Sequence, residues 1–416
     1  MTTPFTVVFI VLLAAATLIR LWLVRRHIAC VIANRGKVPD RFAEKIDLPA
    51  HQKAADYTVA KSRLEVRSLL VETALLLGLT LGSGLQALHT FWSQHLQGLA
   101  YGVALIFSTL FISALVDLPF ALVRQFGIEA RFGFNRMTPA LFIADLGKQI
   151  LLALIIGTPL ILAVLWLMDA MGSLWWLYVW LVWSAFNLLI LFAYPTWIAP
   201  WFNKFTPLDD AGLKTRIEAL LTRCGFHSSG LFVMDGSKRS SHGNAYFSGL
   251  GRAKRIVFFD TLLARLQPPE IEAVLAHELG HYRLRHIGQR IVLMFALSLA
   301  LLFLLGQLIA APWFYQGLGV SSQNTALALV LFFLVMPVFT FPFSPLMSLL
   351  SRRHEYQADA YAATHTRADD LVQALVKLYQ DNAATLTPDP LHSLFYDSHP
   401  PAALRIARLQ AKAEQA

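Results

Sequence analysis

The sequence predicts a mainly α-helical, polytopic membrane protein with seven transmembrane helices and a separate polar domain that contains a small β-sheet. Of its 416 residues, 56% are hydrophobic and only 15% are charged, whereas an ordinary soluble protein has about 25% charged residues. The hydrophobic residues are concentrated in seven runs, each close to the roughly 20 residues that cross a bilayer as a helix. Two long polar blocks lie after the fifth and the seventh run, and they predict the separate domain.

The seven apolar runs define the predicted spans in chain order. They cover residues 5–24, 69–88, 100–116, 149–167, 174–192, 291–311 and 326–341. The first run is also long enough for a cleavable signal peptide, but its flank MTTP carries no positive charge and no small-residue cleavage site stands out. We therefore expect the first run to remain as a membrane anchor.

Positive charge is distributed unevenly between the two predicted sides of the membrane. Lysine and arginine are absent from four segments, namely MTTP, 89–99, 168–173 and 312–325. Because cytoplasmic loops retain positive charge, we expect the N-terminus outside, and the polar domain and the C-terminus in the cytoplasm. The formal net charge of +9 then reflects topology and contact with the lipid bilayer, so it does not predict nucleic-acid binding. Cys30 and Cys224 fall on the cytoplasmic side and are expected to be free thiols.

The polar blocks divide the chain into four parts. These are spans 1–5 with their loops (1–194), a first polar block (195–289), spans 6 and 7 (290–350) and a second polar block (351–416). In the first block, GLFVMD (230–235) and KRIVFFDTLL (254–263) are rich in Val, Ile and Phe and bounded by Gly, Asp and Lys, a pattern typical of strands. HGNAYFSGLG (242–251) can supply a further strand.

The stretch AVLAHELGHYRLRH (273–286) contains the pattern HELGH on a predicted helix. A proline pair at 268–269, followed by acidic residues, marks the start of this helix, and we expect the helix to continue toward the sixth span. Because residues four apart share a helix face, His277 and His281 can present imidazoles to one metal ion, with Glu278 beside them to activate a water molecule. This arrangement is typical of a metalloprotease, although the five-residue pattern also occurs without a metal.

A catalytic zinc ion requires a third protein ligand and one open position. One protease class supplies that ligand directly as HExxHxxGxxH, but Leu284 and Ile287 stand where the pattern needs Gly and His. His286 would lie about 140° around the helix from His281, so we expect it to be a surface histidine or one that supports the site from outside. The third ligand is then expected to be a distant glutamate.

SRRHEYQADAYA (351–362), just after the seventh run, supplies a candidate for that glutamate. On a helix, Glu355 and Asp359 share a face, so Glu355 can bind the ion while Asp359 orients a ligand histidine or handles a proton. The alternative is a solvated helix face on which these carboxylates pair with Arg352 and Arg353.

DSHPPAALR (397–405) carries two further candidates. His399 precedes a proline pair that restricts its backbone, and Arg405 follows at helical spacing. A histidine and an arginine near a metal can stabilise an oxyanion. The alternative is a helix N-terminus with incidental basic residues.

RSSHGNAYFSG (239–249) carries a candidate substrate contact. Asn244 and Ala245 can belong to an edge strand that binds an extended peptide through main-chain hydrogen bonds. The alternative is an ordinary hairpin, and we do not expect His242 to be a metal ligand.

Taken in order, these stretches resemble the type I CAAX prenyl endopeptidases, a family of seven-span membrane zinc metallopeptidases with an HExxH motif and a separate glutamate ligand. The resemblance rests on EARFGFNRMT (129–138), PTWIAPWFNKFTPL (195–208), DGSKRSSHGNAYFSG (235–249), KRIVFFDTLL (254–263), AHELGHYRLRH (276–286), SRRHEYQADAYA (351–362) and SHPPAALR (398–405).

The resemblance implies roles for nine residues of this chain. These are His277, His281 and Glu355 as ligands of one Zn²⁺, Glu278 as general base, Asp359 as a supporting or proton-donating residue, His399 and Arg405 as residues that stabilise the transition state, and Asn244 and Ala245 as the strand that holds the substrate. It also implies that the seven helices surround a large chamber, closed on the cytoplasmic side by a zinc protease domain of the gluzincin type, in which two histidines and a glutamate bind the metal.

The expected function is therefore zinc-dependent hydrolysis of peptide bonds in prenylated or membrane-bound proteins. The first 115 residues match the family pattern little, and the loop after the first span differs from that of eukaryotic members, so we expect a bacterial homologue in the cell inner membrane. A cell without protein prenylation has no CAAX substrates, so quality control of misfolded membrane proteins is an alternative. A non-enzymatic scaffold or translocon factor with a structural zinc is another, although a structural site would not need Glu278.

Overall fold

A computed structural model describes residues 3–248 and 255–413 of the chain. Lys254, the end of the expected strand 242–251 and the end of the block 351–416 lie outside the described residues. The described helices are α1 (Pro4–Asn34), α2 (Leu48–Leu79), α3 (Gly84–His95), α4 (Gly98–Leu122), α5 (Pro139–Ala170), α6 (Trp175–Ala193), α7 (Ala211–Arg223), α8 (Asp260–Leu263), α9 (Pro268–Arg283), α10 (His286–Leu308), α11 (Pro312–Gly317), α12 (Thr325–Thr340), α13 (Ser344–His365), α14 (Ala368–Asp381), α15 (Pro390–Tyr396) and α16 (Ala402–Ala413).

Most of the predicted spans are long, unbroken helices. Among the described residues, six helical segments are long and apolar enough to cross a membrane: Pro4–Asn34, Gly98–Glu129, Pro139–Ala170, Gly172–Trp201, His286–Leu308 and Thr325–His365. The predicted span 69–88 is different, because α2 and α3 meet there at an angle of 51° and together form a bent seventh candidate. By length and composition, the described residues thus give six candidate spans, or the predicted seven if the bent pair crosses the membrane as one span.

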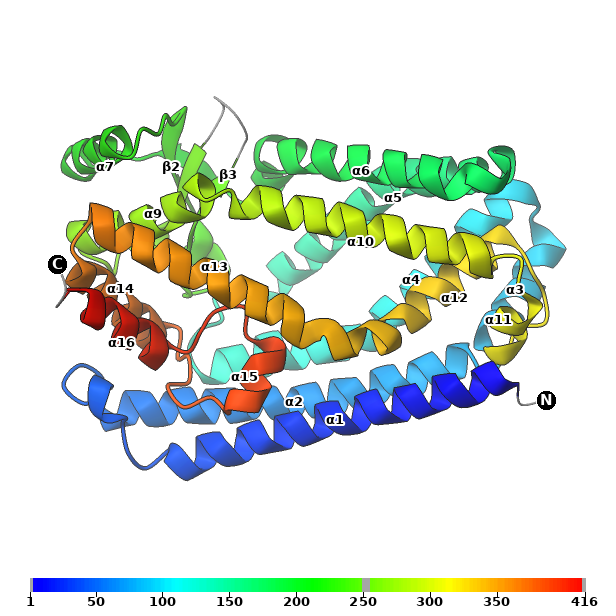
Figure 1. Ribbon diagram of the computed structural model, residues 1–416, viewed down its shortest axis with the longest axis horizontal. Coiled ribbons are helices and arrows are strands. Elements are labelled where there is room, and N and C mark those ends of the chain that lie inside the picture. The colour runs from blue at the N-terminus through cyan, green and yellow to red at the C-terminus, as the bar shows by residue number, and fades with distance from the viewer. Residues whose placement is uncertain (1–2, 249–254, 414–416) are drawn as a thin grey trace.

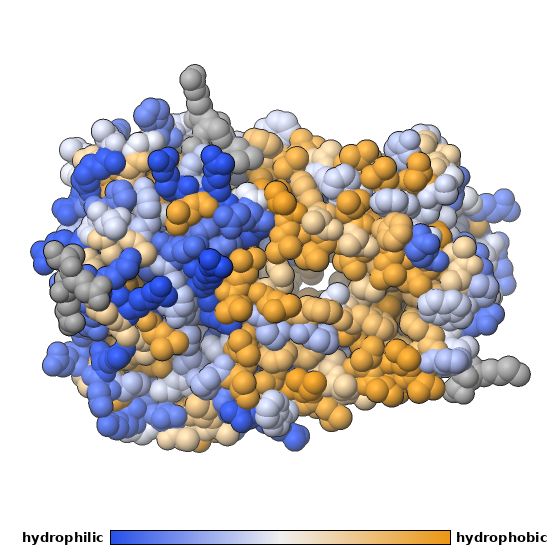
Figure 2. Space-filling view, viewed as in Figure 1, coloured by the Kyte–Doolittle hydropathy of each residue, from blue (hydrophilic) through white to orange (hydrophobic). Residues whose placement is uncertain are grey.

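The membrane and polar parts lie at opposite ends of the molecule. Figure 1 shows the long helices side by side along the longest axis, while α7, α9, α14, α16 and the sheet gather at one end. In Figure 2 the apolar side chains form a broad area over the helical part, and polar side chains dominate the end that carries the sheet. This division agrees with the predicted separation of spans and polar domain.

The helix through HELGH does not continue into the sixth span as predicted. α9 ends at Arg283, and Arg285 adopts a left-handed conformation with a φ of 58° before α10 begins at His286. A residue with these dihedrals cannot continue a right-handed α-helix, and for a non-glycine residue the conformation is costly because its Cβ crowds the following carbonyl. The metal-binding motif and the span therefore belong to two helices that meet at a turn.

The seventh span, by contrast, passes almost directly into the second polar block. α12 is followed by one short turn of 3-10 helix, Phe341–Phe343, and then by α13. Pro337 and Pro342 lie near this transition, and proline removes a helical hydrogen bond where it occurs. The segment 351–362 is therefore helical, as predicted, and lies on α13.

Among the described residues, four strands form the small sheet: β1 (Phe205–Pro207), β2 (Gly230–Met234), β3 (Ala245–Ser248) and β4 (Arg255–Phe259), in the order β1-β2-β4-β3. β2 and β4 are parallel, whereas β1 and β3 are antiparallel to their neighbours. The strands predicted at 230–235 and 242–251 are present. The strand predicted over 254–263 is shorter, because Asp260–Leu263 is helix α8, and β1 was not predicted.

The polar domain has its own hydrophobic core. Apolar side chains of α7, α9, α14 and α16 pack against the sheet, with Phe258 of β4 and Ile217 of α7 fully buried between them. This packing fixes α9 against both the sheet and the C-terminal helices.

An apolar cavity of about 980 Å³ lies among the spans. Its lining comes from α4, α5, α6, α10, α12 and α13, and Arg290 is the charged side chain in that lining. Figure 2 shows an opening to the interior within the apolar surface. The structure therefore contains an intramembrane cavity where the resemblance implied a chamber.

Close packing of α9 on α13 predicts the effect of enlarging Gly280. A Cβ at this position would lie 3.0 Å from the Ala358 Cα and 3.2 Å from its carbonyl oxygen. Backbone atoms cannot move aside as a flexible side chain can, so Gly280→Val is expected to destabilise the protein by about 1–3 kcal/mol. Unfolding of the detergent-solubilised protein by heat and by denaturant measures this change. Gly288→Val is the matched control, because nothing lies within 4 Å of a Cβ at Gly288; equal losses for both variants would contradict the prediction.

Candidate functional site

Two buried glutamates near the N-terminus of helix α9 hold the helix in place. The side chain of Glu270 accepts a hydrogen bond from the Gln267 backbone N–H and also pairs with Lys377 of α14 at 2.7 Å. Two residues further along the helix, the buried Glu272 pairs with Arg216 and with Arg223 of α7. These glutamates, which lie near the positive end of the helix dipole, thus tie α9 to helices on two sides.

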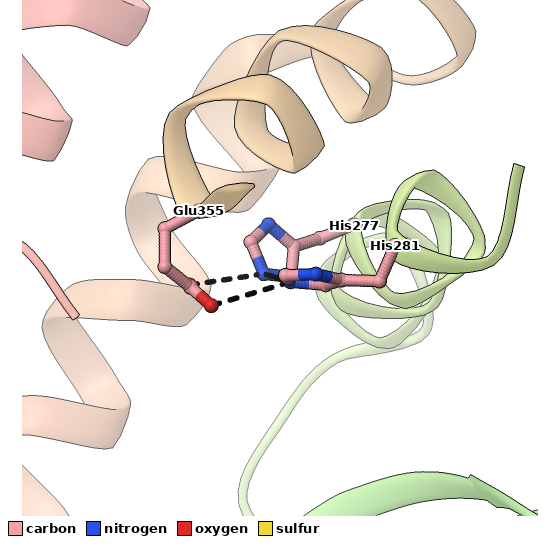
Figure 3. A group of neighbouring side chains, drawn as sticks. All are labelled: His277, His281 and Glu355. Atoms are coloured by element: carbon pink, nitrogen blue, oxygen red, sulfur yellow. Dashed lines mark hydrogen bonds and ion pairs between the residues drawn. The ribbon is translucent and has the colours of Figure 1, made fainter. Parts of the chain in front are cut away.

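His277, His281 and Glu355 form the centre of the site. His277 Nε2 and His281 Nε2 lie 3.2 Å apart. Glu355 reaches them from α13, with Oε2 at 3.4 Å from His277 Nε2 and Oε1 at 3.3 Å from His281 Nε2. Figure 3 shows the two imidazoles of α9 pointing at this carboxylate. Within the described part of the chain, these three side chains are the one group that can hold a metal ion.

The three groups fit a zinc ion. A tetrahedral zinc with bonds of about 2.0–2.2 Å places its ligand atoms about 3.3–3.6 Å apart, close to the observed separations of 3.2–3.4 Å. Glu355 Oε2 is buried and accepts no hydrogen bond from the described residues. A buried, unsatisfied carboxylate oxygen that faces two imidazole nitrogens is suited to a cation. Two imidazoles and one carboxylate are also ligand types that zinc accepts.

His277 is oriented by a buried ion pair. Its Nδ1 lies 2.9 Å from Asp359 Oδ1, and Arg405 donates two hydrogen bonds to the same carboxylate, at 2.9 and 2.6 Å. Burial alone would lower the pKa of His277, but the nearby carboxylates of Asp359 and Glu355 outweigh burial and raise the pKa to about 9 in the metal-free protein. Asp359 and Arg405 are thus brought to the metal site, where Asp359 contacts a candidate ligand directly.

Glu278 lies beside the ligand group but is not part of it. Its side chain is half-buried and lines a cavity of about 270 Å³ that also reaches His277 and Glu355. Burial raises the pKa of Glu278, although the neighbouring His277 and His281 oppose the shift. A carboxylate with a raised pKa beside a metal site can accept and return a proton near neutral pH.

The other candidates line the same cavity. Asn244, Ala245, His399 and Arg405 all contribute to its wall. His399 Nε2 lies 3.4 Å from Glu355 Oε1, and its side chain is 59% exposed. Asn244 directly precedes β3, and its carbonyl oxygen accepts a hydrogen bond from the Phe259 N–H. The structure therefore brings all nine residues named from the sequence to one place.

Two further residues lie near the site. Of the two positions expected for His286, the structure excludes the surface one and favours the supporting one, because the turn at Arg285 leaves the residue only 2% exposed and places it 3.1 Å from His281. Asn382, not identified from sequence, lines the cavity and accepts hydrogen bonds from Gly243 and His242. His242 lies outside the metal-binding group, as expected. No local sequence signal points to Asn382, whereas the third histidine of HELGHYRLRH was a signal for His286.

Two family models match the chain along most of its length. Residues 27–204 match the CAAX prenyl protease N-terminal region, described as five membrane helices. Residues 207–413 match peptidase family M48.

Named CAAX prenyl proteases match stretches of the chain long enough to include residues from both of these regions. CAAX prenyl protease 1 of Saccharomyces cerevisiae is 39% identical over 327 residues, which cover 73% of this chain and 71% of that protein. The human CAAX prenyl protease 1 homolog is 35% identical over 354 residues, covering 74% and 72%. The crystal structure of S. mikatae Ste24p superposes with a TM-score of 0.92 at 31% identity and covers 98% of this chain and 100% of that one.

The pKa of His277 predicts how zinc binding depends on pH. His277 must lose its proton to bind the ion, and in the metal-free protein that proton is held with a pKa of about 9. Zinc affinity is therefore expected to fall about tenfold for each pH unit below that value. Competition with a metal-sensitive dye at several pH values measures this slope. Asp359→Asn removes the negative charge that holds the proton on His277, so the decrease in zinc affinity should begin at a lower pH in this variant. Equal zinc affinities at pH 6 and pH 8 in the unsubstituted protein would rule the prediction out.

Proposed function

Because the chain belongs to peptidase family M48 and also carries the CAAX prenyl protease N-terminal region, we propose that its nine site residues form one zinc centre that cleaves lipid-modified protein substrates. The protein is an integral-membrane zinc metalloprotease of the CAAX type. The observation that carries the proposal is the cavity of about 270 Å³, which exposes the metal-binding group to Glu278, Asn244 and His399. A structural zinc site would be closed by a fourth ligand.

We assign the metal to His277, His281 and Glu355. When bound there, zinc supplies a Lewis acid that polarises the scissile carbonyl and acidifies the attacking water. Glu278 takes the proton from that water, since it lines the cavity and lies next to a ligand in the chain. Its raised pKa suits it to hold this proton and pass it to the leaving amine.

Asp359 and Arg405 hold the ligand His277 in its orientation. Asp359 is held by two hydrogen bonds from Arg405 and contacts His277, so its geometry favours orienting the ligand over delivering a proton to substrate. Glu278, which faces the cavity, is then the proton donor for the leaving amine.

Oxyanion stabilisation is assigned to His399 together with Arg405. His399 is exposed to the cavity through which a substrate carbonyl would approach. Arg405 Nη1 lies 3.5 Å from Glu355 Oε2 and also lines the cavity, which places a positive charge near the developing oxyanion.

The substrate is proposed to extend along β3. This strand pairs with β4 on one side and ends the sheet on the other. Asn244 and Ala245 line the cavity at its start, so an extended peptide added to this edge would enter the cavity.

The lipid group of the substrate has a suitable environment in the membrane part. The cavity of about 980 Å³ among the spans is lined mainly by apolar side chains, and burying an isoprenoid chain there would stabilise the complex by about 25 cal/mol per Å² of apolar surface. The relatives named above are CAAX prenyl proteases, which supports prenylated substrates for this chain.

The orientation and the source of the protein remain predictions. The lysine and arginine distribution supports an outside N-terminus and a cytoplasmic protease domain. The division of the chain at residues 194, 289 and 350 likewise follows from the apolar runs. A bacterial inner membrane was inferred from the N-terminal region, whereas the relatives matched here are eukaryotic.

Glu278→Gln is expected to abolish turnover without loss of zinc. The amide cannot accept a proton, so kcat/KM should fall by about 10²- to 10⁴-fold, while the three ligands remain. His281→Ala should lose both turnover and zinc. Metal analysis of the purified variants, together with peptide cleavage assays, separates these effects. Normal turnover by Glu278→Gln would show that another group is the base.

A farnesylated CAAX-type peptide and its unmodified counterpart test the substrate class. The unsubstituted protein in detergent should cleave the farnesylated peptide much faster, because the apolar cavity contributes binding only to that peptide. Glu278→Gln is the control for cleavage by contaminants. Equal, Glu278-dependent cleavage of both peptides would contradict lipid recognition and favour a quality-control protease instead.

A further inference from the structure

The turn between α9 and α10 places a third histidine directly behind a metal ligand. His286 is the first residue of α10, and the left-handed Arg285 before it breaks the helix, so His286 does not take the position it would have on a continuation of α9. As a result, His286 Nδ1 lies 3.1 Å from His281 Nδ1. The ring of His286 is 2% exposed, so water does not compete for this contact.

The hydrogen bonds around these rings allow only one arrangement of protons when zinc is bound. His281 directs Nε2 at Glu355 and His277, so a neutral His281 that binds metal through Nε2 carries its proton on Nδ1. That proton is donated to His286 Nδ1, which therefore accepts. His286 must then carry its own proton on Nε2, and this nitrogen lies 3.0 Å from the amide oxygen of Gln357, an acceptor. From His281 through His286 to Gln357, each ring N–H thus faces an acceptor.

A second pair of residues fixes the plane of the His286 ring. His354 of α13 stacks on it with ring centroids 4.0 Å apart and an angle of 7° between planes. His354 Nε2 lies 3.0 Å from the amide oxygen of Gln289 on α10. α10 and α13 therefore each contribute one histidine and one glutamine. The histidine of each helix contacts the glutamine of the other.

The two ligand histidines have partners of different charge. His277 Nδ1 faces the carboxylate of Asp359, whereas His281 Nδ1 faces the neutral imidazole of His286. A partner on the second ring nitrogen determines the tautomer and orientation of a metal-binding histidine. Both rings are therefore fixed, the first by a charged acceptor and the second by a neutral one.

We propose that His286 is a positioning residue of the metal centre, which accepts the Nδ1 proton of His281 and is itself oriented by Gln357. This inference rests on the zinc site of the proposed function. It concerns how firmly the site holds the ion, so zinc affinity, rather than turnover, is the measured quantity.

The test compares zinc affinities, measured by competition with a chelator, for the unsubstituted protein and four variants. His286→Phe keeps a flat ring against His354 but removes the acceptor, and zinc affinity should fall about 10- to 100-fold. His286→Asn places an amide oxygen near the Nδ1 position and should recover most of that loss. Gln357→Leu removes only the outer acceptor and should produce a smaller loss. His354→Phe is the matched control, since it keeps the stacking on His286 and leaves the His286 acceptor in place, and its affinity should fall much less than that of His286→Phe.

Several results would overturn the inference. These are an unchanged zinc affinity in His286→Phe, an equal loss in His354→Phe, or no recovery in His286→Asn. Thermal melting of the metal-free variants checks folding, and Gln357→Leu still tests the chain of hydrogen bonds if His286→Phe does not fold. His281→Ala separates this inference from the proposed function. If His281→Ala still binds zinc, the assignment of the metal site itself is wrong. If His281→Ala loses zinc but His286→Phe keeps full zinc affinity, only the role of His286 is rejected.

Discussion

The direct contact between α9 and α13 is the constraint on which the site depends. Gly280 faces the backbone of Ala358 with no side chain between them. On α9 the two ligand histidines lie on either side of Gly280, and on α13 Glu355 and Asp359 lie on either side of Ala358. A wider separation of the helices would lengthen every distance from Glu355 to the imidazoles, which are now 3.3–3.4 Å. One glycine therefore sets the spacing of ligands that come from distant parts of the chain.

This contact also buries charge, and the balance of that charge favours a cation. Glu355, Asp359 and Arg405 have side chains that are only 5–6% exposed. Moving an ion from water into the interior costs several kcal/mol unless it is paired. Arg405 neutralises one of the two carboxylates, so these three groups leave one negative charge, which the proton held by His277 balances in the metal-free protein. A divalent cation at the ligand group would replace that proton and offset the remaining charge.

Local patterns in the sequence predicted the features that depend on local chemistry. Apolar runs gave the spans, and the proline pair at 268–269 gave the start of α9, because hydropathy and helix starts are determined by adjacent residues. The break at Arg285 could not be predicted, since arginine has no preference for a left-handed conformation and tertiary packing imposes it. Glu355 was favoured through the family resemblance, because no spacing rule relates it to HELGH. The choice between a surface and a supporting position for His286 stayed open for the same reason, because it depends on that break.

The helices that carry the ligands are joined to candidate membrane spans by short turns, which couples the metal site to the apolar cavity. α13 follows α12 after one short turn, and α9 is joined to α10 by the turn at Arg285. Ile287 and Arg290 of α10 line the cavity next to His286, and α12 and α13 line it as well. The histidine and glutamine pairs between α10 and α13 hold these helices together at the boundary between cavity and metal site. A lipid bound in the cavity must therefore fit between α10 and α12 without separating α10 from α13, because that separation would break the contact of His286 with Gln357 and disturb the residue that faces His281 Nδ1.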